Sequence, residues 1–318
     1  MKKFPLVSVN IPTYNSSLTL AETLESVKKQ TYPNIEIIVA DGHSQDDTLK
    51  IAKKYGAKVY YAQELGRARF KAFSKSQGKY VLFFDSDQVM DKDLIAKCVA
   101  KCEKTNCDAL TLSEKSIIRK GTLVEKLIAY DKFVIDSLKD DDAIFGTAVP
   151  RFFRAEILRG IVWPKELSVF DHTGIFLEIV KKGAKVEYIS SPSLRHYEVD
   201  SWRKFFKKFY RYGLYYFDAL KGYPGPVIAH SFPRRVYFTK VALRKPAWFL
   251  GLLFLYFVKG IAAALGIIAY FLRKGKVYEV NGKRFHYELA RLCLDQKMAF
   301  NSPVWFNVGT DRYASRRT

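Results

Sequence analysis

The sequence predicts an α/β fold with a Rossmann-like, mostly parallel sheet covered by helices on both faces, followed by C-terminal amphipathic and hydrophobic helices. Three observations predict this fold. Short apolar segments rich in β-branched residues alternate with segments of helical periodicity in the N-terminal half. That alternation is typical of a parallel sheet between two helical layers. A long apolar segment from Pro246 to Leu272 predicts the hydrophobic helix.

The elements of the N-terminal half follow one another in a regular order. The first strand is expected at residues 6–11 and stops at Pro12, and a helix at 18–29 has glutamates near its start and lysines near its end, as the helix dipole prefers. Asp46 or Asp47 can cap the next helix. The remaining expected elements are a strand at 35–40, that helix at 48–55, a strand at 58–61, a basic helix at 66–76 and a strand at 80–84.

Carboxylates and an amide follow three of these strands. Asp85 and Asp87 end the apolar strand at 80–84, and alternation along a strand would point both carboxylates to the same side. A few carboxylate oxygens with substrate phosphates are what a hard divalent cation prefers. Taken alone, Asp-Ser-Asp is also an ordinary turn. Asn15 and Asp41 lie after the first two strands, and ligands of open sheets bind beyond the carboxyl ends of strands. One ligand site at one sheet edge is therefore predicted.

Three motifs in order carry a family resemblance. Residues 11–15 (IPTYN), 41–48 (DGHSQDDT) and 84–87 (FDSD) together resemble the family 2 glycosyltransferases, which are inverting enzymes of the GT-A fold that use nucleotide sugars. The resemblance covers about residues 5–215 and is closest in the N-terminal part. It implies a nucleotide-diphosphate sugar as donor and Mg²⁺ or Mn²⁺ as cofactor.

The resemblance also implies roles for the residues that border the donor. Pro12, Thr13 and Asn15 are expected to border the nucleotide. Asp41 is expected to receive the base through a hydrogen bond to a ring N–H, and Asp46 is expected to support that loop.

The same resemblance implies a metal and diphosphate site. Asp85 is expected near the ribose or the metal, and Asp87 is expected to ligate the cation that bridges the two phosphates. A divalent ion there would stabilise the charge that develops on the leaving diphosphate. Arg67 is expected either to contact phosphate or to lie on a solvated helix face. His196 is a second candidate for closing over the metal and diphosphate, with a structural histidine as the alternative.

The acceptor side depends on Asp171 and His172, which precede an expected helix at 175–180. Many relatives place a Glu-Asp pair at this helix start, where a carboxylate acts as general base. His172 is then one candidate base, because an ordinary histidine pKa suits proton abstraction at neutral pH. Alternatively, Asp171 is the base and His172 contacts phosphate or metal. A lipid phosphate acceptor would need no strong base, and Asp171 could also be a simple N-cap.

Membrane association is predicted from the C-terminal half. Residues 201–216 interleave aromatic and basic side chains, as interfacial helices do, and the net charge of the chain is +21. Because familiar nucleic-acid-binding motifs are lacking, an anionic membrane surface is the expected partner and no nucleic acid is expected. The apolar segment is long enough to cross a bilayer as one helix. Lys259-Gly260 in its middle leaves open a hairpin that turns there and lies in the interface.

These observations divide the chain into a GT-A domain at 1–225, a membrane-associated segment at 226–278 and a tail of unknown role at 279–318. Residues 296–309 resemble a short segment of cobalamin-dependent ribonucleotide reductases, but the tail has no room for the reductase barrel, so no activity is carried over. No signal peptide is expected at the N-terminus. The expected location is the cell membrane, with the catalytic domain on the cytoplasmic side.

The leading functional hypothesis is a membrane-associated inverting glycosyltransferase that moves a sugar from a nucleotide-diphosphate donor to a lipid-linked or cell-surface glycan acceptor. A polyprenyl-phosphate glycosyl synthase is the enzymatic alternative. A scaffold that binds nucleotide or membrane without turnover is an alternative of another class, and the unusual Asp171-His172 pair keeps it open.

Overall fold

The computed structural model describes the chain except residues 1–3, 137–148, 232–236, 238 and 275–318. Two compact units are present, Met1–Tyr270 and Phe271–Thr318. The predicted domain boundary at residue 225 stays a prediction. The reductase-like segment at 296–309 lies outside the described residues.

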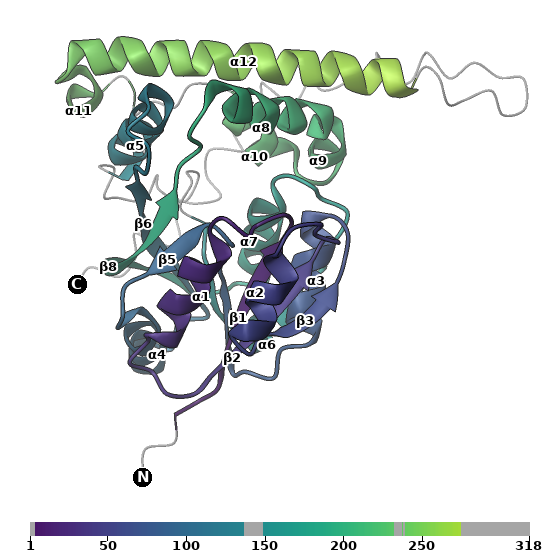
Figure 1. Cartoon of the computed structure of the whole chain (residues 1–318), viewed down its shortest axis with the longest axis vertical. Coiled ribbons are helices and arrows are strands. Elements are labelled where there is room, and N and C mark those ends of the chain that lie inside the picture. The colour runs from purple at the N-terminus through teal and green to yellow at the C-terminus, as the bar shows by residue number, and fades with distance from the viewer. Residues whose placement is uncertain (1–3, 137–148, 232–236, 238, 275–318) are drawn as a thin grey trace, which may run out of the picture. The chain divides into compact units, whose positions relative to one another are not determined.

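A mixed sheet of eight strands forms the centre of the first unit (Figure 1). Its strands are β1 (Val7–Thr13), β2 (Ile35–Asp41), β3 (Lys58–Tyr61), β4 (Tyr80–Phe83), β5 (Gln88–Met90), β6 (Ala109–Ile117), β7 (Phe152–Arg154) and β8 (Val186–Tyr197). Their order is β3-β2-β1-β4-β7-β6-β8-β5. The first four strands in this order are parallel, as predicted. Strand β7 is antiparallel to both of its neighbours, and the sequence analysis did not predict β5, β6 or β7.

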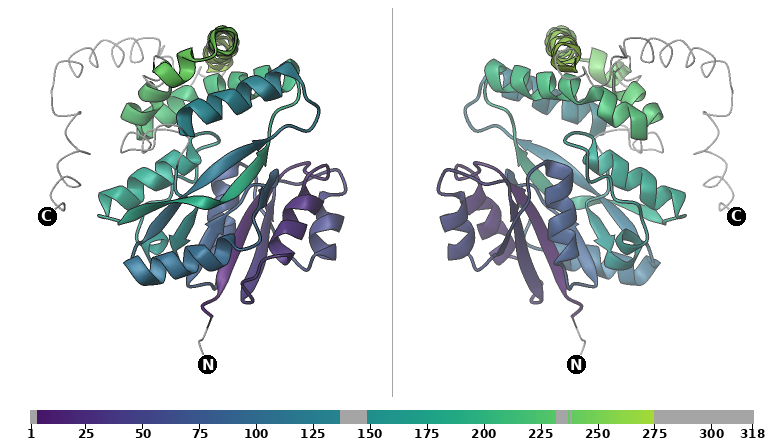
Figure 2. Two further views of the ribbon diagram at one scale, coloured as in Figure 1. Left: turned by 90° about the vertical axis from the view of Figure 1, so that its left-hand side faces the viewer. Right: turned by 90° about the vertical axis from the view of Figure 1, so that its right-hand side faces the viewer.

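Helices cover both faces of the sheet, which confirms the predicted fold class (Figure 2). One apolar core lies under α1, α2 and α4, and the other face is covered by α3, α6 and α7. The helices are α1 (Leu20–Lys28), α2 (Thr48–Lys54), α3 (Leu65–Ser74), α4 (Leu94–Thr105), α5 (Leu123–Asp136), α6 (Ala155–Arg159), α7 (Asp171–Lys181), α8 (Trp202–Leu214), α9 (Tyr216–Gly222), α10 (Pro224–Ser231), α11 (Lys240–Leu243) and α12 (Pro246–Lys274).

Helix α12 is continuous through Lys259 and Gly260, so the alternative hairpin with a turn at this point is wrong. Its length and composition are those of a helix that could cross a membrane. Within the first unit, however, one face of α12 packs on α5 and α8 (Figure 1). At Gly213 the backbones of α8 and α12 approach so closely that an added Cβ would collide with the carbonyl oxygen of Ala263.

One further expectation changes at the sheet edge. Strand β4 ends at Phe83, so Asp85 and Asp87 lie in a turn and strand alternation does not orient them. Strand β8 runs as far as Tyr197, because its second part pairs with β6 and β5. The continuation places His196 in a strand that faces the turn after β4.

Candidate active site

A cavity of about 800 Å³ lies at the carboxyl ends of the parallel strands. Most of the predicted site residues come together in its lining, which supports the expectation of one ligand site at this sheet edge. The predicted residues that line it are Pro12, Thr13, Asp85, Asp87, Asp171, His172 and His196. Asn15, Asp41, Asp46 and Arg67 are not among its lining residues.

Asp41 is fully buried at the end of β2. The register of β1 and β2 places it opposite Thr13, whose hydroxyl donates to Asp41 Oδ1 over 2.7 Å. The backbone N–H of Ser44 donates to Oδ2 over 2.8 Å, and the Ser44 hydroxyl donates to Oδ1. Asp41 thereby ties together the ends of the two strands. Its role toward a base stays a prediction.

Asn15 and Asp46 organise the neighbouring loops. Asn15 has a positive φ of 48°, and its side-chain oxygen accepts from the Gln45 N–H over 2.8 Å. Asp46 Oδ2 accepts from the Ser17 N–H, and its Oδ1 accepts from the Thr48 N–H and hydroxyl. Burial would raise the pKa of Asp46, but these hydrogen bonds lower it to about 2. Both residues therefore shape the loops that border the cavity. The N-cap of α2 is Asp47, whose side chain makes no capping hydrogen bond.

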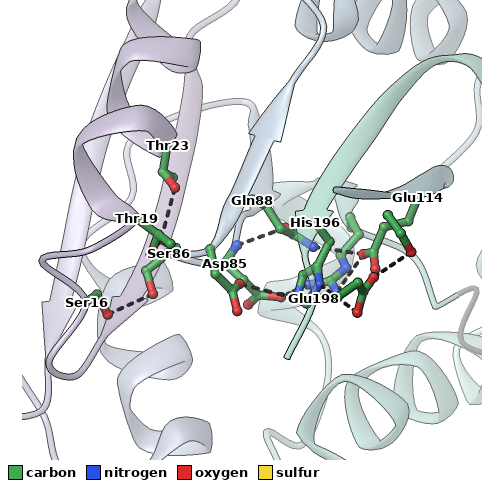
Figure 3. A network of polar contacts seen from close by, with 12 residues as sticks. Ser16, Thr19, Thr23, Asp85, Ser86, Gln88, Glu114, His196 and Glu198 are labelled. Atoms are coloured by element: carbon green, nitrogen blue, oxygen red, sulfur yellow. Dashed lines mark hydrogen bonds and ion pairs between the residues drawn. The ribbon is translucent and has the colours of Figure 1, made fainter. Parts of the chain in front are cut away.

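The turn that carries Asp85 and Asp87 is fixed at the residue between them (Figure 3). The carbonyl oxygen of Ser86 accepts from the hydroxyls of Thr19 and Thr23 at 2.8 and 3.0 Å. The Ser86 hydroxyl lies 2.9 Å from that of Ser16. These bonds hold Ser86 against the start of α1, while Figure 3 shows Asp85 directed to the other side, toward the group around His196.

Asp85 lies between two arginines. Its Oδ1 accepts from Arg69 Nη2 over 2.8 Å, and its Oδ2 accepts from Arg151 Nη1 over 2.6 Å. Burial alone would raise the pKa of the Asp85 carboxyl, but the charges of Arg151 and Arg69 hold it well below its usual range. Asp85 is thus an anion with both oxygens engaged by guanidinium groups. Metal coordination by Asp85 would require one of these contacts to give way.

Asp171 and His172 begin α7 after Phe170, whose left-handed conformation ends the preceding segment. Asp171 is therefore the first helical residue and makes no capping bond, so the simple N-cap alternative is wrong. Its Oδ2 accepts from Arg69 Nε, and although burial raises the pKa of Asp171, the Arg69 charge lowers it overall. Asp171 is therefore ionised at neutral pH and bound to the guanidinium of Arg69.

His172, in contrast to Asp171, is uncharged at neutral pH. Burial and the charges of Arg69 and Arg151 lower the pKa of His172 to about 4. Arg151 Nη1 lies 2.9 Å from His172 Nε2. A neutral imidazole can accept a proton, and the role of His172 as the base stays a prediction.

His196 and Asp87 fit a divalent cation. His196 Nε2 lies 3.4 Å from Asp87 Oδ1, and the Asp87 side chain is 45% exposed toward the cavity. Burial would lower the pKa of His196, but Asp87 raises it to about 9. In the described part of the chain no group of three or more His, Cys, Asp or Glu residues could hold a metal by itself. With this pKa the His196 imidazole is protonated at neutral pH, so a cation whose other ligands are substrate phosphates and water would bind Asp87 and could be ligated by His196 only after that proton is lost.

A buried ion-pair network lies behind this pair. Lys132 Nζ lies 2.6 Å from Glu114 Oε1 and 2.7 Å from Glu198 Oε1, and Glu198 Oε2 lies 3.6 Å from His196 Nδ1. Gln88 Nε2 donates to Glu114 over 2.8 Å (Figure 3). Burial would raise the pKa of Glu114 and Glu198, but the Lys132 charge and their hydrogen bonds lower both to about 2. The network fixes His196 in its orientation toward Asp87.

Three cations of this site are not among the residues predicted to form it. Arg69, Arg151 and Lys132 line the cavity, each bound to one or more of the carboxylates. Glu198 lies one residue beyond the end of β8, so strand alternation does not identify it from His196. Arg151 and Lys132 had no local signal either. Arg67 lies outside the group, with its Nη2 2.5 Å from Glu166 Oε2, and its phosphate contact stays a prediction.

Comparisons with known proteins find similarity to one family over part of the chain. Residues 8–162 match the model described as Glycosyl transferase family 2. The poly(ribitol-phosphate) beta-N-acetylglucosaminyltransferase TarS of Staphylococcus aureus is 30% identical over 180 residues, covering 53% of this chain and 30% of TarS. The putative teichuronic acid biosynthesis glycosyltransferase TuaG of Bacillus subtilis is 33% identical over 153 residues, covering 46% of this chain and 59% of TuaG. The chain thus spans less than two thirds of either relative.

Solved structures agree on the fold. The crystal structure of S. aureus TarS 1-349 has a TM-score of 0.52 at 21% identity and covers 87% of this chain and 95% of that one. The mannosyltransferase PcManGT from Pyrobaculum calidifontis, in complex with GDP-Man and Mn²⁺, has a TM-score of 0.50 at 15% identity, covering 96% and 83%. Residues 8–162 of the chain are thus similar to glycosyl transferase family 2, and the fold of the chain is that of these solved glycosyltransferase structures.

Proposed function

We propose that the protein is a membrane-associated inverting glycosyltransferase that moves a sugar from a nucleotide-diphosphate donor to a lipid-linked or cell-surface glycan acceptor. The observation that carries the proposal is the convergence of Asp87 and His196 in a cavity at the carboxyl ends of β1, β2 and β4. A divalent cation at this pair, Mg²⁺ or Mn²⁺, would stabilise the leaving diphosphate as a Lewis acid.

The protein's own residues then divide the work of the site. Thr13 and Asp41 form the nucleotide side, and Pro12 lies next to them in the cavity wall. Arg69 and Arg151 keep Asp85 ionised and immobile, close to where the ribose or metal is expected. The network of Lys132, Glu114 and Glu198 orients His196. Preorganised charges of this kind lower the barrier because they need no rearrangement when the sugar–phosphate bond breaks.

Membrane association is supported by the outer face of α12. The exposed apolar side chains on this face follow helical spacing and form one stripe, which marks an interaction surface. Arg244 and Lys245 are exposed before its start, and their charge complements anionic lipid. The stripe consists of Leu250, Leu253, Phe254, Phe257, Ile261, Leu265 and Ile268.

The packing of α12 also favours one orientation at the membrane. Gly251 packs against Leu127 of α5, and Gly213 and Gly266 bring α8 and α12 into backbone contact. Because α12 packs on α5 and α8 in this way, it could cross the bilayer only if these helices entered the bilayer as well. We therefore propose that α12 lies in the membrane plane on the cytoplasmic side of the cell membrane, where nucleotide sugars are available.

The test is turnover by the full chain in vesicles of bacterial total lipid extract. UDP-sugars and GDP-sugars are supplied one at a time with Mn²⁺, and nucleoside diphosphate release and sugar transfer to the lipid fraction are both measured. One donor is expected to release its diphosphate in step with transfer, and Asp87→Ala is expected to abolish both. Binding of a nucleotide without turnover of any donor would favour the scaffold alternative.

A further inference from the structure

Three cysteines lie together in the apolar core under α4. Cys98 and Cys102 belong to α4, and Cys107 lies between α4 and β6. All three are free thiols, and their side chains are fully buried. None of them lines the cavity at the strand ends. The fourth cysteine of the chain, Cys293, lies outside the described residues. The proposed glycosyl transfer therefore makes no use of this cluster of thiols.

Cys102 and Cys107 are in direct contact through their sulfur atoms. The two Sγ atoms lie 3.2 Å apart. The contact arises because Asn106, with a left-handed φ of 53°, ends α4 and turns the chain so that Cys107 lies back against the last turn of the helix. A disulfide joins two cysteines whose Cβ atoms are about 3.5–4.5 Å apart. Thiols that are already in contact need only a small movement to form this bond.

Cys98 does not share this geometry. It lies four residues before Cys102 on α4. Side chains at this spacing on a helix have Cβ atoms about 5–6 Å apart, which is more than an unstrained disulfide allows. Among the described residues, Cys98 makes no hydrogen bond with either of the other two thiols. Burial raises the pKa of the Cys98 thiol, so Cys98 is protonated and unreactive at neutral pH.

The surroundings of the pair favour reaction at Cys107. The hydrogen bond with Cys102 lowers the pKa of the Cys107 thiol, and the charge of Arg154 lowers it further. Arg154 is held beside the pair, because its Nε donates to the Cys107 carbonyl oxygen over 2.8 Å and its Nη2 donates to that of Cys102 over 2.7 Å. The thiolate is the form of cysteine that attacks an oxidant. Because both sulfurs are buried, that oxidant must be small.

We infer that Cys102 and Cys107 are a redox-sensitive dithiol, which closes to a disulfide with hydrogen peroxide and opens again with a thiol reductant. The Cys107 thiolate attacks one oxygen of the peroxide, the O–O bond breaks and hydroxide leaves, so that Cys107 becomes a sulfenic acid. The Cys102 sulfur then bonds to the Cys107 sulfur, and the sulfenic oxygen leaves as water. In sum, two thiols lose two electrons and two protons, and one peroxide becomes two molecules of water.

The place of the pair gives the disulfide a structural consequence. Arg154 is the last residue of β7, and its two hydrogen bonds tie this strand end to the carbonyl groups of Cys102 and Cys107. Arg151, directly before β7, binds Asp85 in the candidate active site. Closure would therefore fix the anchor of the strand that follows Arg151. Reversible disulfides of this kind are typical of redox sensing in a reducing compartment, and the inference does not depend on the proposed function.

Peptide mapping of the full chain tests the inference. Trypsin cleaves after the lysines that separate the three cysteines, which therefore fall on peptides 98–101, 102–104 and 105–115. The reduced, folded protein is treated with hydrogen peroxide, blocked with N-ethylmaleimide in urea and digested without reductant. The disulfide-linked peptides 102–104 and 105–115 are expected to be at least about tenfold more abundant than any pair that contains 98–101. Dithiothreitol added before blocking is expected to remove the link.

Two variants serve as matched controls. Cys98→Ala is expected to retain the link within about twofold of wild type, whereas Cys102→Ala is expected to leave Cys107 as a sulfenic acid that dimedone traps. Circular dichroism shows whether each variant is folded, and the wild-type map decides the inference by itself. Linkage through Cys98 to a similar extent would overturn the assigned pair. Three unreacted thiols, or sulfinic acid at Cys107 without linkage, at a peroxide concentration that oxidises the urea-unfolded chain would overturn the redox-sensitive dithiol.

Discussion

His196 Nε2 in β8 lies 3.4 Å from Oδ1 of Asp87, which belongs to the turn after β4. The two residues are far apart in the sequence, and the antiparallel pairing of β5 with β8 brings them together. One carboxylate and, once its proton is lost, one imidazole at this separation leave the remaining positions of a divalent cation to phosphate and water. The donor site that we propose depends on this pair.

Replacement of His196 by Gln is expected to weaken Mn²⁺ binding in the presence of UDP or GDP. Because loss of even an indirect partner of a metal ligand costs about 10–100-fold in affinity, we expect at least tenfold here. Titration of free Mn²⁺ by electron paramagnetic resonance measures it. His43→Gln, at an exposed histidine stacked on Tyr61, is the control. Unchanged Mn²⁺ affinity in His196→Gln would remove His196 from the metal site.

Arg69→Met is expected to destabilise the fold. Arg69 is 3% exposed and bound to both Asp85 and Asp171, so its removal leaves two carboxylates without that partner in the interior. Breaking a buried ion pair in this way lowers the free energy of unfolding by about 3–5 kcal/mol. Urea unfolding measures the change.

Arg67→Met is the matched control for that measurement. Arg67 lies on the same helix, but its ion pair with Glu166 is exposed, so we expect a loss of at most about 1 kcal/mol. Equal destabilisation by the two variants would show that the buried ion pairs do not hold the site together.

The start of α5 is expected to contribute a pH-dependent part of stability. Glu125 is buried, and its carboxylate accepts from the backbone N–H groups of Arg119, Lys120 and Thr122. Burial raises its pKa, but these hydrogen bonds lower it overall. A lowered folded-state pKa gives stability that is fully present above the unfolded value, about 4.3, and is lost as the pH falls through the folded value.

Glu125→Gln is therefore expected to lower the free energy of unfolding by about 1–3 kcal/mol at pH 7. The gap to wild type should narrow as the pH falls below about 4. Urea unfolding at several pH values measures it, with the exposed Glu156→Gln as the control. A gap that is the same at every pH would contradict the proposed contribution of the charge.

The outer face of α12 is expected to control binding to vesicles. Phe257 is 64% exposed in the middle of the apolar stripe, and Phe257→Glu would place a charge there. We expect partitioning to phosphatidylglycerol vesicles to fall by about tenfold or more, as a charge in this position opposes burial in lipid. Flotation on a density gradient measures the bound fraction. Leu18→Glu, at an exposed residue before α1, should bind like the wild type, and equal binding by Phe257→Glu would exclude this face.

Part of the site could be predicted because the residue patterns that indicate it lie in short continuous segments of the sequence. Apolar strands that end at Asp41 or shortly before Asp85 indicate the sheet edge, since parallel strands bring their carboxyl ends together. Arg151 and Lys132 reach the same site from β7 and α5 through tertiary packing, which no local pattern encodes. For α5 a signal was available, because Thr122 and Glu125 form a capping box.

The orientation of helix α12 could not be predicted from the sequence. Its apolar composition predicts an affinity for lipid, but composition does not say whether a helix crosses a membrane or lies on it. Gly213 and Gly266 decide how α12 packs on α8, and this contact depends on two helices that are separated along the chain.

The most direct test of the donor site is calorimetric titration of UDP and GDP into the full chain with and without Mn²⁺, for wild type and Asp87→Asn. We predict that one nucleotide binds the wild type at one site, that Mn²⁺ increases its affinity, and that Asp87→Asn loses the increase. Absence of binding by folded wild-type protein, or binding that neither Mn²⁺ nor Asp87→Asn changes, would contradict the proposed metal-dependent glycosyltransferase.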